Sequence, residues 1–348
     1  MVAGPCSAET REQVLETAAA LGDTGTALYR AGVWKPRTRP GSFEGNGKEA
    51  LGWLQEVKAM HGLPVAIEVA EPEHVELALW HGIDVLWIGA RTTVNPFQVQ
   101  HIADALRGVD IPVMVKNPVN PDVDLWEGAI ERLRRVGVND VAAIHRGFSG
   151  YSAASPYRNA PNWPIPIELK RRNPLLPIVC DPSHITGNRD MVAEVAQKAM
   201  DMGFEGLMIE THPHPDAAWS DAAQQVTPAA LKAILQQLAI RQPHTADMDR
   251  RTRLEDLRQQ MDSIDMEVVD LIARRMELSN DIGAVKKACN MAAYQPERWN
   301  EIVETRGSRA AKLGMGQEFI VALYQLIHDE SIRRQLEILQ GGDKEIKN

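Results

Sequence analysis

The chain has 348 residues, of which 44% are hydrophobic, and its formal net charge is −9. This length predicts more than one domain, and the acidic balance argues against a nucleic-acid-binding protein. The chain has only three cysteines, and their spacing does not suggest a set of disulfides. No secretory leader is visible, and no apolar run reaches the ~20 residues that span a membrane. We therefore expect a cytoplasmic, soluble protein without disulfides.

Eight short β-prone runs recur along the first two-thirds of the chain, separated by helix-like stretches such as 11–25, 73–82 and 189–203. Near-continuous apolar strands are typical of a parallel sheet buried on both faces. Eight strand–helix units within residues 1–240 predict an α/β fold, a (β/α)8 TIM barrel. A doubly wound open sheet is the alternative, which the lack of a Gly-rich phosphate loop disfavours. The runs are 2–6, 27–34, 65–70, 85–90, 113–117, 141–147, 178–184 and 206–212.

The pattern changes at residues 241–252, where Pro243 and polar side chains predict a linker. The rest of the chain, residues 253–340, is predicted to be an all-helical domain, and residues 341–348 a flexible tail. The expected helices are 254–288, 297–312 and 317–340.

An apolar seam, interrupted by one arginine, runs along the first of these helices with steps of three and four residues. A helix of this length cannot bury such a seam alone, so we expect a partner chain. The seam consists of Leu254, Leu257, Met261, Ile264, Val268, Leu271, Arg275, Leu278, Ile282 and Val285.

Metal-binding side chains gather at the predicted carboxyl ends of the barrel strands, where barrel enzymes have their active sites. Each one alone is more often structural, but thiolate, imidazole and carboxylate groups on one face together favour a divalent transition metal. Cys180, inside the seventh predicted strand and four residues before its end, is instead predicted to be a core residue. The candidate residues are Cys6 (first strand), His184 (seventh), Glu210 and His212 (eighth) and Asp221 in the next loop.

Basic residues follow the same strand ends. Such a ring of cations in an acidic protein predicts binding of phosphate and carboxylate groups, although any single member could merely keep a loop solvated. Residues 41–47 are predicted to form a mobile loop and lid beside them. The cations are Lys35 and Arg37 (second strand), Arg91 (fourth), Lys116 (fifth) and Arg146 (sixth).

Several spaced motifs over roughly residues 1–240 resemble type I 3-deoxy-D-arabino-heptulosonate 7-phosphate (DAHP) synthases. These motifs are AGPCS, KPRT with GSFEG, IGAR, CDPSH and IETHP. The resemblance implies condensation of phosphoenolpyruvate with erythrose 4-phosphate, and a divalent metal such as Mn, Fe, Zn or Co on Cys6, His184, Glu210 and Asp221. It implies that erythrose 4-phosphate binds Pro36, Arg37 and Thr38. Phosphoenolpyruvate would contact Lys35, Arg91, Lys116, Arg146 and His212.

Two alternatives to this activity remain open at the level of sequence. The first is the related 3-deoxy-D-manno-octulosonate 8-phosphate synthase, which condenses phosphoenolpyruvate with arabinose 5-phosphate. Its members carry residues like KANRS where this chain has KPRT, which favours the four-carbon aldehyde. The second is a metal-stabilised scaffold without enzymatic activity. One position departs from the family pattern, since His145 stands where many relatives have a glutamate.

Arg275 occupies a position of the helical seam that periodicity predicts to be apolar, and a buried arginine requires an anion. Lys286, eleven residues further on, returns to almost the same helix face, whereas Arg258 points roughly 100° away, toward a neighbouring chain. Ser331 and Gln335 share a face at i, i+4. The alternative is a dimerisation coiled coil that tolerates one arginine.

The helical part of the chain, about residues 254–340, resembles all-helical chorismate mutases. The segments that carry the resemblance are LRQQMDSID, LIARRMELSNDIGAVK, YQPER and LYQLIHDESIRRQ. The resemblance implies conversion of chorismate to prephenate in a homo-oligomer, a dimer through this domain, with a tetramer left open. It implies a site lined by Arg275, Lys286, Arg298, Ser331 and Gln335, with Arg258 donated by the other chain.

Two family positions of this helical domain differ here, because Gln295 and Trp299 stand where acidic residues are usual. We also expect the domain to mediate feedback inhibition of the barrel by prephenate or chorismate. A non-catalytic regulatory or oligomerisation module is the alternative.

Overall fold

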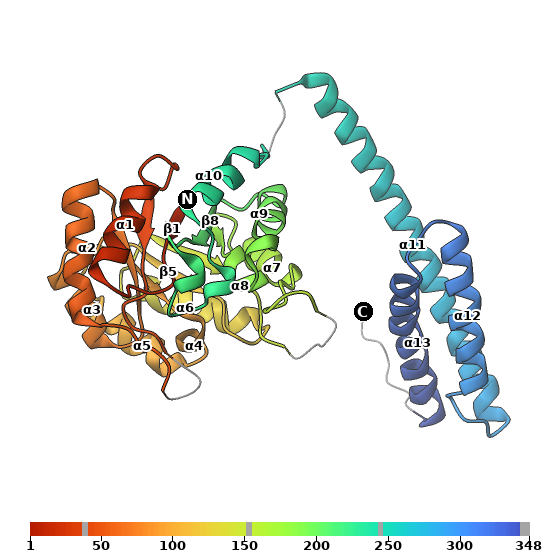
Figure 1. Cartoon of the computed structure of the whole chain (residues 1–348). Helices are drawn as coiled ribbons and strands as arrows, with labels where there is room; N and C mark the ends of the chain where they lie inside the picture. The colour runs from red at the N-terminus through yellow and green to blue at the C-terminus, as the bar shows by residue number, and fades with distance from the viewer. Residues whose placement is uncertain (37–40, 151–154, 243–245, 342–348) are drawn as a thin grey trace. The chain divides into compact units, whose positions relative to one another are not determined.

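The computed structural model describes residues 1–36, 41–150, 155–242 and 246–341 (Figure 1). The chain divides into two compact units, Met1–Pro243 and His244–Asn348. No helix of the described residues is long and apolar enough to cross a membrane.

The first unit is a closed barrel in which each strand pairs in parallel with the next and β8 pairs with β1. The predicted TIM barrel is thus confirmed, and the open sheet is excluded. Most strands are shorter than the apolar runs that predicted them. They are β1 (Val2–Gly4), β2 (Leu28–Arg30), β3 (Val65–Val69), β4 (Val85–Ile88), β5 (Val113–Lys116), β6 (Val141–His145), β7 (Ile178–Cys180) and β8 (Gly206–Glu210).

Helices surround the barrel, and side-chain caps or a proline in the first turn begin most of them. Thr10, for example, accepts a hydrogen bond from the N–H of Gln13 at the start of α1. The helices are α1 (Arg11–Leu21), α2 (Lys48–His61), α3 (Pro72–Trp80), α4 (Ala90–Thr93), α5 (Pro96–Ala105), α6 (Val123–Arg135), α7 (Pro164–Arg172), α8 (Pro182–Thr186), α9 (Val192–Asp201) and α10 (Pro228–Gln237).

Alternate strand residues form two separate cores. One set packs against the helices, and the other fills the inside of the barrel as an apolar plug. The fully buried residues of this plug include Trp87 and Ile144. The plug closes the barrel below its carboxyl-end mouth, so polar residues further along the same strands lie above an apolar floor.

The seventh strand differs from the prediction, because it ends at Cys180 rather than at residue 184. Cys180 is therefore the last residue of β7, although its prediction as a core residue is confirmed by its complete burial. His184 lies in α8 instead of on a strand. Asp181 causes this change, since its side chain caps α8 by accepting from the N–H of His184 (3.1 Å).

The described part of the second unit, residues 246–341, forms the helices α11 (Met248–Ala288), α12 (Pro296–Lys312) and α13 (Gln317–Leu339). The long helix begins six residues earlier than predicted, so residues 248–252 are helical rather than part of a linker. Asp247 explains the earlier start, because its side chain caps the helix at the N–H of Arg250 (3.1 Å).

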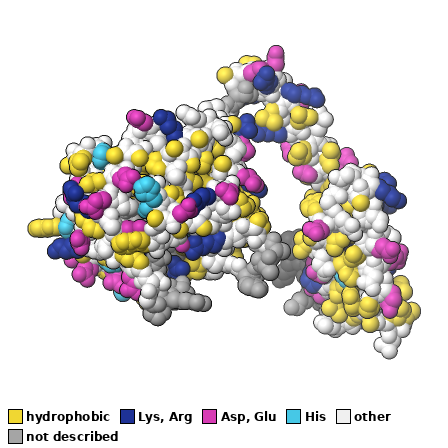
Figure 2. Space-filling model, viewed as in Figure 1, with side chains coloured by type: hydrophobic (Ala, Val, Ile, Leu, Met, Phe, Trp, Pro, Cys, Tyr) yellow, Lys and Arg dark blue, Asp and Glu magenta, His cyan; other side chains and the backbone are white. Residues whose placement is uncertain are grey.

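Only the second half of α11 has a buried face, formed by Met276, Ser279, Gly283 and Lys286. Gly283 allows a close approach to α13, since a Cβ atom there would lie 3.3 Å from the Cα of Gln335. The apolar seam residues of α11 are exposed in the single chain. Hydrophobic side chains accordingly gather on the surface of this unit in the view of Figure 2.

Candidate active sites

Charged residues line the inside of the barrel immediately above the apolar plug. Side chains two positions apart on a strand point to the same side. Each of these charged residues stands two positions after a residue that belongs to the plug or packs on it, namely Leu28, Met114, Val179 and Met208. The charged residues are Arg30, Lys116, Asp181 and Glu210, all of them almost completely buried. Burial of so many charges requires that they be paired, and the structure shows the pairs.

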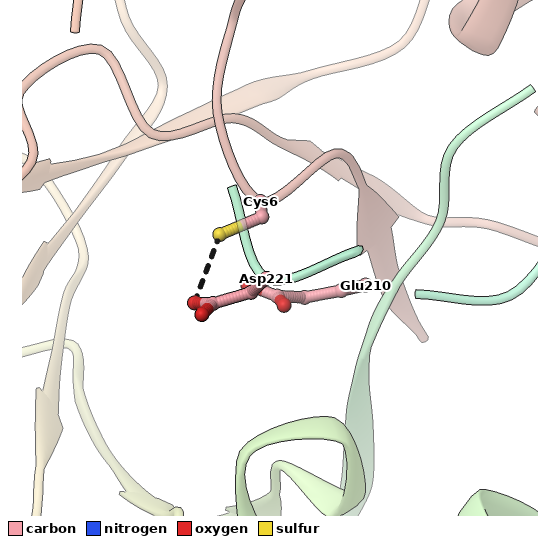
Figure 3. Close-up of side chains that lie close together, drawn as sticks. All are labelled: Cys6, Glu210 and Asp221. Atoms are coloured by element: carbon pink, nitrogen blue, oxygen red, sulfur yellow. Dashed lines mark hydrogen bonds between the residues drawn. The ribbon is translucent and has the colours of Figure 1, made fainter. Parts of the chain in front are cut away.

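The thiol of Cys6 lies beside the carboxylates of Glu210 and Asp221 (Figure 3). One ligand atom from each of these residues lies within 4.8 Å of the others, and Cys6 Sγ is 3.4 Å from Asp221 Oδ2. Sulfur and carboxylate oxygen atoms at this spacing form a set that could hold a divalent metal ion. Cys6 lies in the loop after β1 rather than on the predicted strand, because β1 ends at Gly4. The predicted convergence of Cys6, Glu210 and Asp221 at the mouth is nevertheless present in the fold.

The protonation of this cluster reflects its burial. Burial raises the pKa of the Cys6 thiol to about 12, and the nearby Glu210 carboxylate adds to the increase. Burial would also raise the pKa of Asp221, but His184 and Arg158 outweigh that effect and hold it below its usual value. Without a bound cation the sulfur thus stays a thiol, whereas a metal ion would favour the thiolate.

His184 stands next to the cluster. Its Nε2 is 3.7 Å from Glu210 Oε1, and its Nδ1 is 2.7 Å from Asp181 Oδ2. A metal-binding histidine commonly has its second ring nitrogen held by a carboxylate in this way. Asp181 itself bridges to Lys116, whose Nζ lies 3.0 Å from the same oxygen.

Arg30, Asp181 and Arg158 are site residues that were not identified from the sequence. Arg30 donates to Glu210 Oε1 (2.9 Å) and to the carbonyl of Cys6 (3.0 Å), and its guanidinium lies 4.9 Å from the ring centre of Trp87. The alternation of inward and outward side chains along β2 could have found Arg30, because the apolar Leu28 precedes it by two positions.

The predicted phosphate- and carboxylate-binding residues do not all converge in the same way. Lys35 donates to Cys6 Sγ (3.0 Å), and Arg146 donates to Asn159 Oδ1 (2.8 Å). Arg91 is exposed, with Nη1 3.4 Å from the carbonyl of Pro36. His212 is buried with Nε2 3.6 Å from Glu9 Oε2. Arg37 and Thr38 lie outside the described residues.

The loop at residues 41–47, predicted to be mobile, contacts both sides of the mouth. Two backbone hydrogen bonds join the loop to the residues that follow β2. The N–H of Lys35 donates to Glu44 O (2.8 Å), and the N–H of Gly47 donates to Val33 O (2.9 Å). The Phe43 ring packs edge-on against Trp219, with ring centres 5.1 Å apart. Its role as a lid stays a prediction.

His145, the departure from the family pattern, points away from the mouth. Its ring packs among aromatic side chains of the outer core, including Trp163 at 5.1 Å and Phe148 at 5.8 Å between ring centres. Burial, with Arg146 adding a smaller effect, lowers the pKa of His145 to about 3, so the ring is neutral.

The helical unit contains a cavity of about 500 Å³ whose walls come from α11, α12 and α13. Arg275 donates to Ser331 Oγ (2.5 Å), and Lys286 donates to Gln335 Oε1 (3.0 Å) and to the carbonyl of Ala293 (2.5 Å). Five predicted residues line it together: Arg275, Lys286, Arg298, Ser331 and Gln335.

The three other positions singled out in this unit lie at different places relative to the cavity. Gln295 lines the cavity. The Trp299 ring instead packs at a tilt of 44° against the His328 ring, with ring centres 4.4 Å apart, beside a separate hollow. Arg258 lies on the exposed first half of α11, 3.6 Å from Glu255. It therefore does not reach the cavity of its own chain.

Comparison with known proteins assigns both units. The model of the DAHP synthetase I family matches residues 1–244, and that of chorismate mutase type II matches residues 257–336. The chain belongs to the DAHP synthetase I family. It joins a DAHP synthase domain to a C-terminal chorismate mutase domain, and is thus a bifunctional enzyme of aromatic biosynthesis.

Individual relatives support this assignment for the barrel. The chain is 31% identical over 238 residues to phospho-2-dehydro-3-deoxyheptonate aldolase of Thermotoga maritima, covering 68% of each protein. It is 29% identical to 2-dehydro-3-deoxyphosphooctonate aldolase of Nitrosococcus oceani, covering 69% of this chain and 88% of that protein. A crystal structure of the Thermotoga enzyme superposes with a TM-score of 0.62 at 30% identity, covering 68% of this chain and 67% of that one.

Proposed function

We propose that the barrel condenses phosphoenolpyruvate with erythrose 4-phosphate and water to give DAHP and inorganic phosphate. C3 of phosphoenolpyruvate attacks the aldehyde carbon, water adds at C2, and phosphate leaves as the C2–O bond breaks. The observation that carries this proposal is the convergence of Cys6, Glu210 and Asp221 beneath a mouth that also holds buried cations.

Cys6, His184, Glu210 and Asp221 would hold the divalent metal ion, whether Mn, Fe, Zn or Co. A bound ion supplies a Lewis acid for the aldehyde oxygen or for the water. The donor set fits such an ion, because a thiol, a buried carboxylate and a half-buried one meet within 4.8 Å and His184 Nε2 lies beside Glu210. Arg30 and Asp181 would orient the ligands, since each bonds to one of them.

The cations of the mouth would bind the two substrates. Lys35, Arg91, Lys116, Arg146 and His212 are assigned to phosphoenolpyruvate, and Pro36, Arg37 and Thr38 to erythrose 4-phosphate. Lys116 is the best supported member, because it is buried above the Trp87 ring and Asp181 is its only ion-pair partner among the described residues. Burial also lowers the pKa of Arg146 to about 10, as expected for a cation kept in a site with little water.

The aldehyde specificity is tested by phosphate release with each candidate. We expect turnover with erythrose 4-phosphate and at most slow turnover with arabinose 5-phosphate. Efficient use of arabinose 5-phosphate alone would support the octulosonate synthase, to which the chain is also 29% identical. Phosphate release with neither aldehyde would leave only a scaffold.

We propose that the helical domain converts chorismate to prephenate. This rearrangement needs no nucleophile: the protein holds a dicarboxylate in a folded conformer and stabilises the charge on its ether oxygen. The cavity offers hydrogen-bond donors that would bind the carboxylates and the ether oxygen. They belong to Arg275, Lys286, Arg298, Ser331 and Gln335. A second chain would cover the exposed seam of α11 and donate Arg258, so we expect at least a dimer.

A regulatory role of the same domain is the second candidate, and the displaced Trp299 ring favours it because the cavity lacks an acid at that position. Prephenate bound to the cavity would inhibit the barrel. Loss of chorismate absorbance with the whole chain separates the two candidates. Turnover supports a mutase, whereas inhibition of phosphate release without turnover supports a sensor alone.

A further inference from the structure

Arg158, in the segment that follows β6, connects the two carboxylates of the cysteine cluster. Its Nη1 donates to Asp221 Oδ1 (3.0 Å) and to Gln224 Oε1 (2.8 Å). Gln224 is buried, and its Nε2 in turn donates to Glu210 Oε2 (2.6 Å). One guanidinium thus fixes one carboxylate directly and the other through a single amide.

The two oxygens of Asp221 have different neighbours. Oδ2 lies 3.4 Å from Cys6 Sγ, whereas Oδ1 contacts Arg158. Asp221 lies in a loop, with a left-handed φ of 48°, so no regular element fixes its side chain. Arg158 therefore holds the outer oxygen and leaves the inner one directed at the thiol.

The backbone around Arg158 is itself attached to the helix that carries His184. The backbone N–H groups of Arg158 and Asn159 donate to Thr186 O (3.2 Å) and Ile185 O (3.0 Å). The side-chain amide of Asn159 also donates to His184 O (2.6 Å). Gly187 makes the approach possible, because a Cβ atom there would lie 2.6 Å from the Cβ of Arg158. The segment is consequently bonded to the surroundings of three candidate ligands.

We propose that Arg158 is a positioning residue for the metal site, acting through Asp221 directly and through Gln224 on Glu210. This inference rests on the proposed function, since it assumes that a metal ion binds at Cys6. Residues that hydrogen-bond to metal ligands orient them and typically contribute 10–100-fold to affinity. The opposite role would be a counter-ion that competes with the metal for Asp221.

Titration of the whole chain with Cd²⁺ tests the proposal, because thiolate–Cd²⁺ charge-transfer absorbance reports occupancy at Cys6 without requiring catalysis. We expect Arg158→Gln to weaken Cd²⁺ binding about 10-fold. Unchanged affinity would overturn the proposal, and tighter binding would identify Arg158 as the competitor. Failure of the unmutated chain to show the absorbance would instead refute the metal site itself.

Arg189→Gln is the matched control. Arg189 bonds to the same loop, at Ala222 O (2.6 Å), but its ion-pair partner is Asp216, which is no candidate ligand. We expect its Cd²⁺ affinity to remain within about 2-fold of the unmutated chain, within the usual scatter of such contributions. An equal loss in both variants would show that loop attachment, not carboxylate orientation, matters.

A second variant guards against misfolding of the first. Gln224→Met preserves side-chain length and leaves the Arg158–Asp221 pair in place, but removes the amide that accepts from Arg158 and donates to Glu210. We expect a smaller loss of Cd²⁺ affinity than in Arg158→Gln, with an unchanged circular dichroism spectrum. A Gln224→Met variant that folds and binds Cd²⁺ as the unmutated chain does would remove the connection to Glu210 from the proposal.

Discussion

The two candidate sites of this chain treat their charges in opposite ways. In the barrel, the two most deeply buried cations have carboxylate partners within the chain, Arg30 with Glu210 and Lys116 with Asp181. In the helical unit, Arg275 and Lys286 donate to neutral oxygens of Ser331, Gln335 and the backbone, and no ion pair of theirs is found among the described residues.

This difference indicates what each site lacks. The barrel cluster combines a thiol and two carboxylates, a donor set that suits a divalent metal ion. The helical cavity presents Arg275 and Lys286 with only neutral acceptors beside them, so these two cations favour an anionic ligand. The two sites therefore suit the two proposed reactions, a metal-dependent condensation in the barrel and a rearrangement that uses only hydrogen bonds and charge in the helical unit.

The largest effect is expected for Cys6→Ser, which replaces the soft sulfur ligand of the barrel with a hard oxygen. We expect loss of measurable metal retention after dialysis and of phosphate release. Metal content measured by atomic emission provides the readout. Cys180→Ser is the matched control, because Cys180 is equally buried but belongs to the outer core. Normal metal content in the Cys6 variant would refute its role as a ligand.

The next effect concerns the helical cavity. Arg275→Ala removes a cation that faces the proposed substrate carboxylate or ether oxygen, and we expect chorismate turnover to fall about 10²–10³-fold. Phosphate release by the barrel should be unaffected. Arg333→Ala is the control, because its partners Glu330 and Glu337 lie on the exposed surface of α13. Equal losses in the two variants would exclude a specific role for Arg275.

A coupling between the two units is expected to be weaker. If the helical domain senses prephenate, saturating prephenate should inhibit phosphate release, with a coupling of about 1–3 kcal/mol. A chain that ends at Ala239 should lose the inhibition while keeping its synthase rate. Arg275→Ala should weaken the inhibition as well. Identical rates with and without prephenate in the full chain would rule out the coupling.

The last effect concerns stability rather than activity, and it is confined to the barrel core in acid. The folded-state pKa of His145 is about 3, below its ordinary value of 6.5, because burial disfavours the charged ring. Between these values the unfolded chain binds the extra proton, so stability falls as pH decreases from 6.5, by up to about 1.4 kcal/mol per pH unit. Chemical unfolding of His145→Phe should show a shallower decrease than the unmutated chain. Parallel pH curves would contradict this assignment.

The sequence predicted the barrel because eight apolar runs alternate with helices, and it predicted Cys6, Glu210 and Asp221 together because strand ends meet at one mouth. His184 was placed on a strand, although the Asp181 cap turns that segment into a helix. Arg30 and Asp181 were accessible to the same reasoning through the alternation of side chains along each strand.

Other features have no signal in a single sequence. Arg158 lies in an irregular loop, and nothing in its spacing relates it to Asp221, 63 residues further on. The seam of α11 was visible as a period of three and four residues. Which face packs inside the chain was not, because the buried face of Ser279, Gly283 and Lys286 is largely small or polar.

The most direct test of the metal account is phosphate release from phosphoenolpyruvate and erythrose 4-phosphate by the whole chain after removal of metal with a chelator. The account predicts no release in the metal-free protein and recovery after Mn²⁺ is added, while chorismate turnover stays constant throughout. Full phosphate release by the metal-free protein would contradict it, because the cluster of Cys6, Glu210 and Asp221 would then have no catalytic purpose.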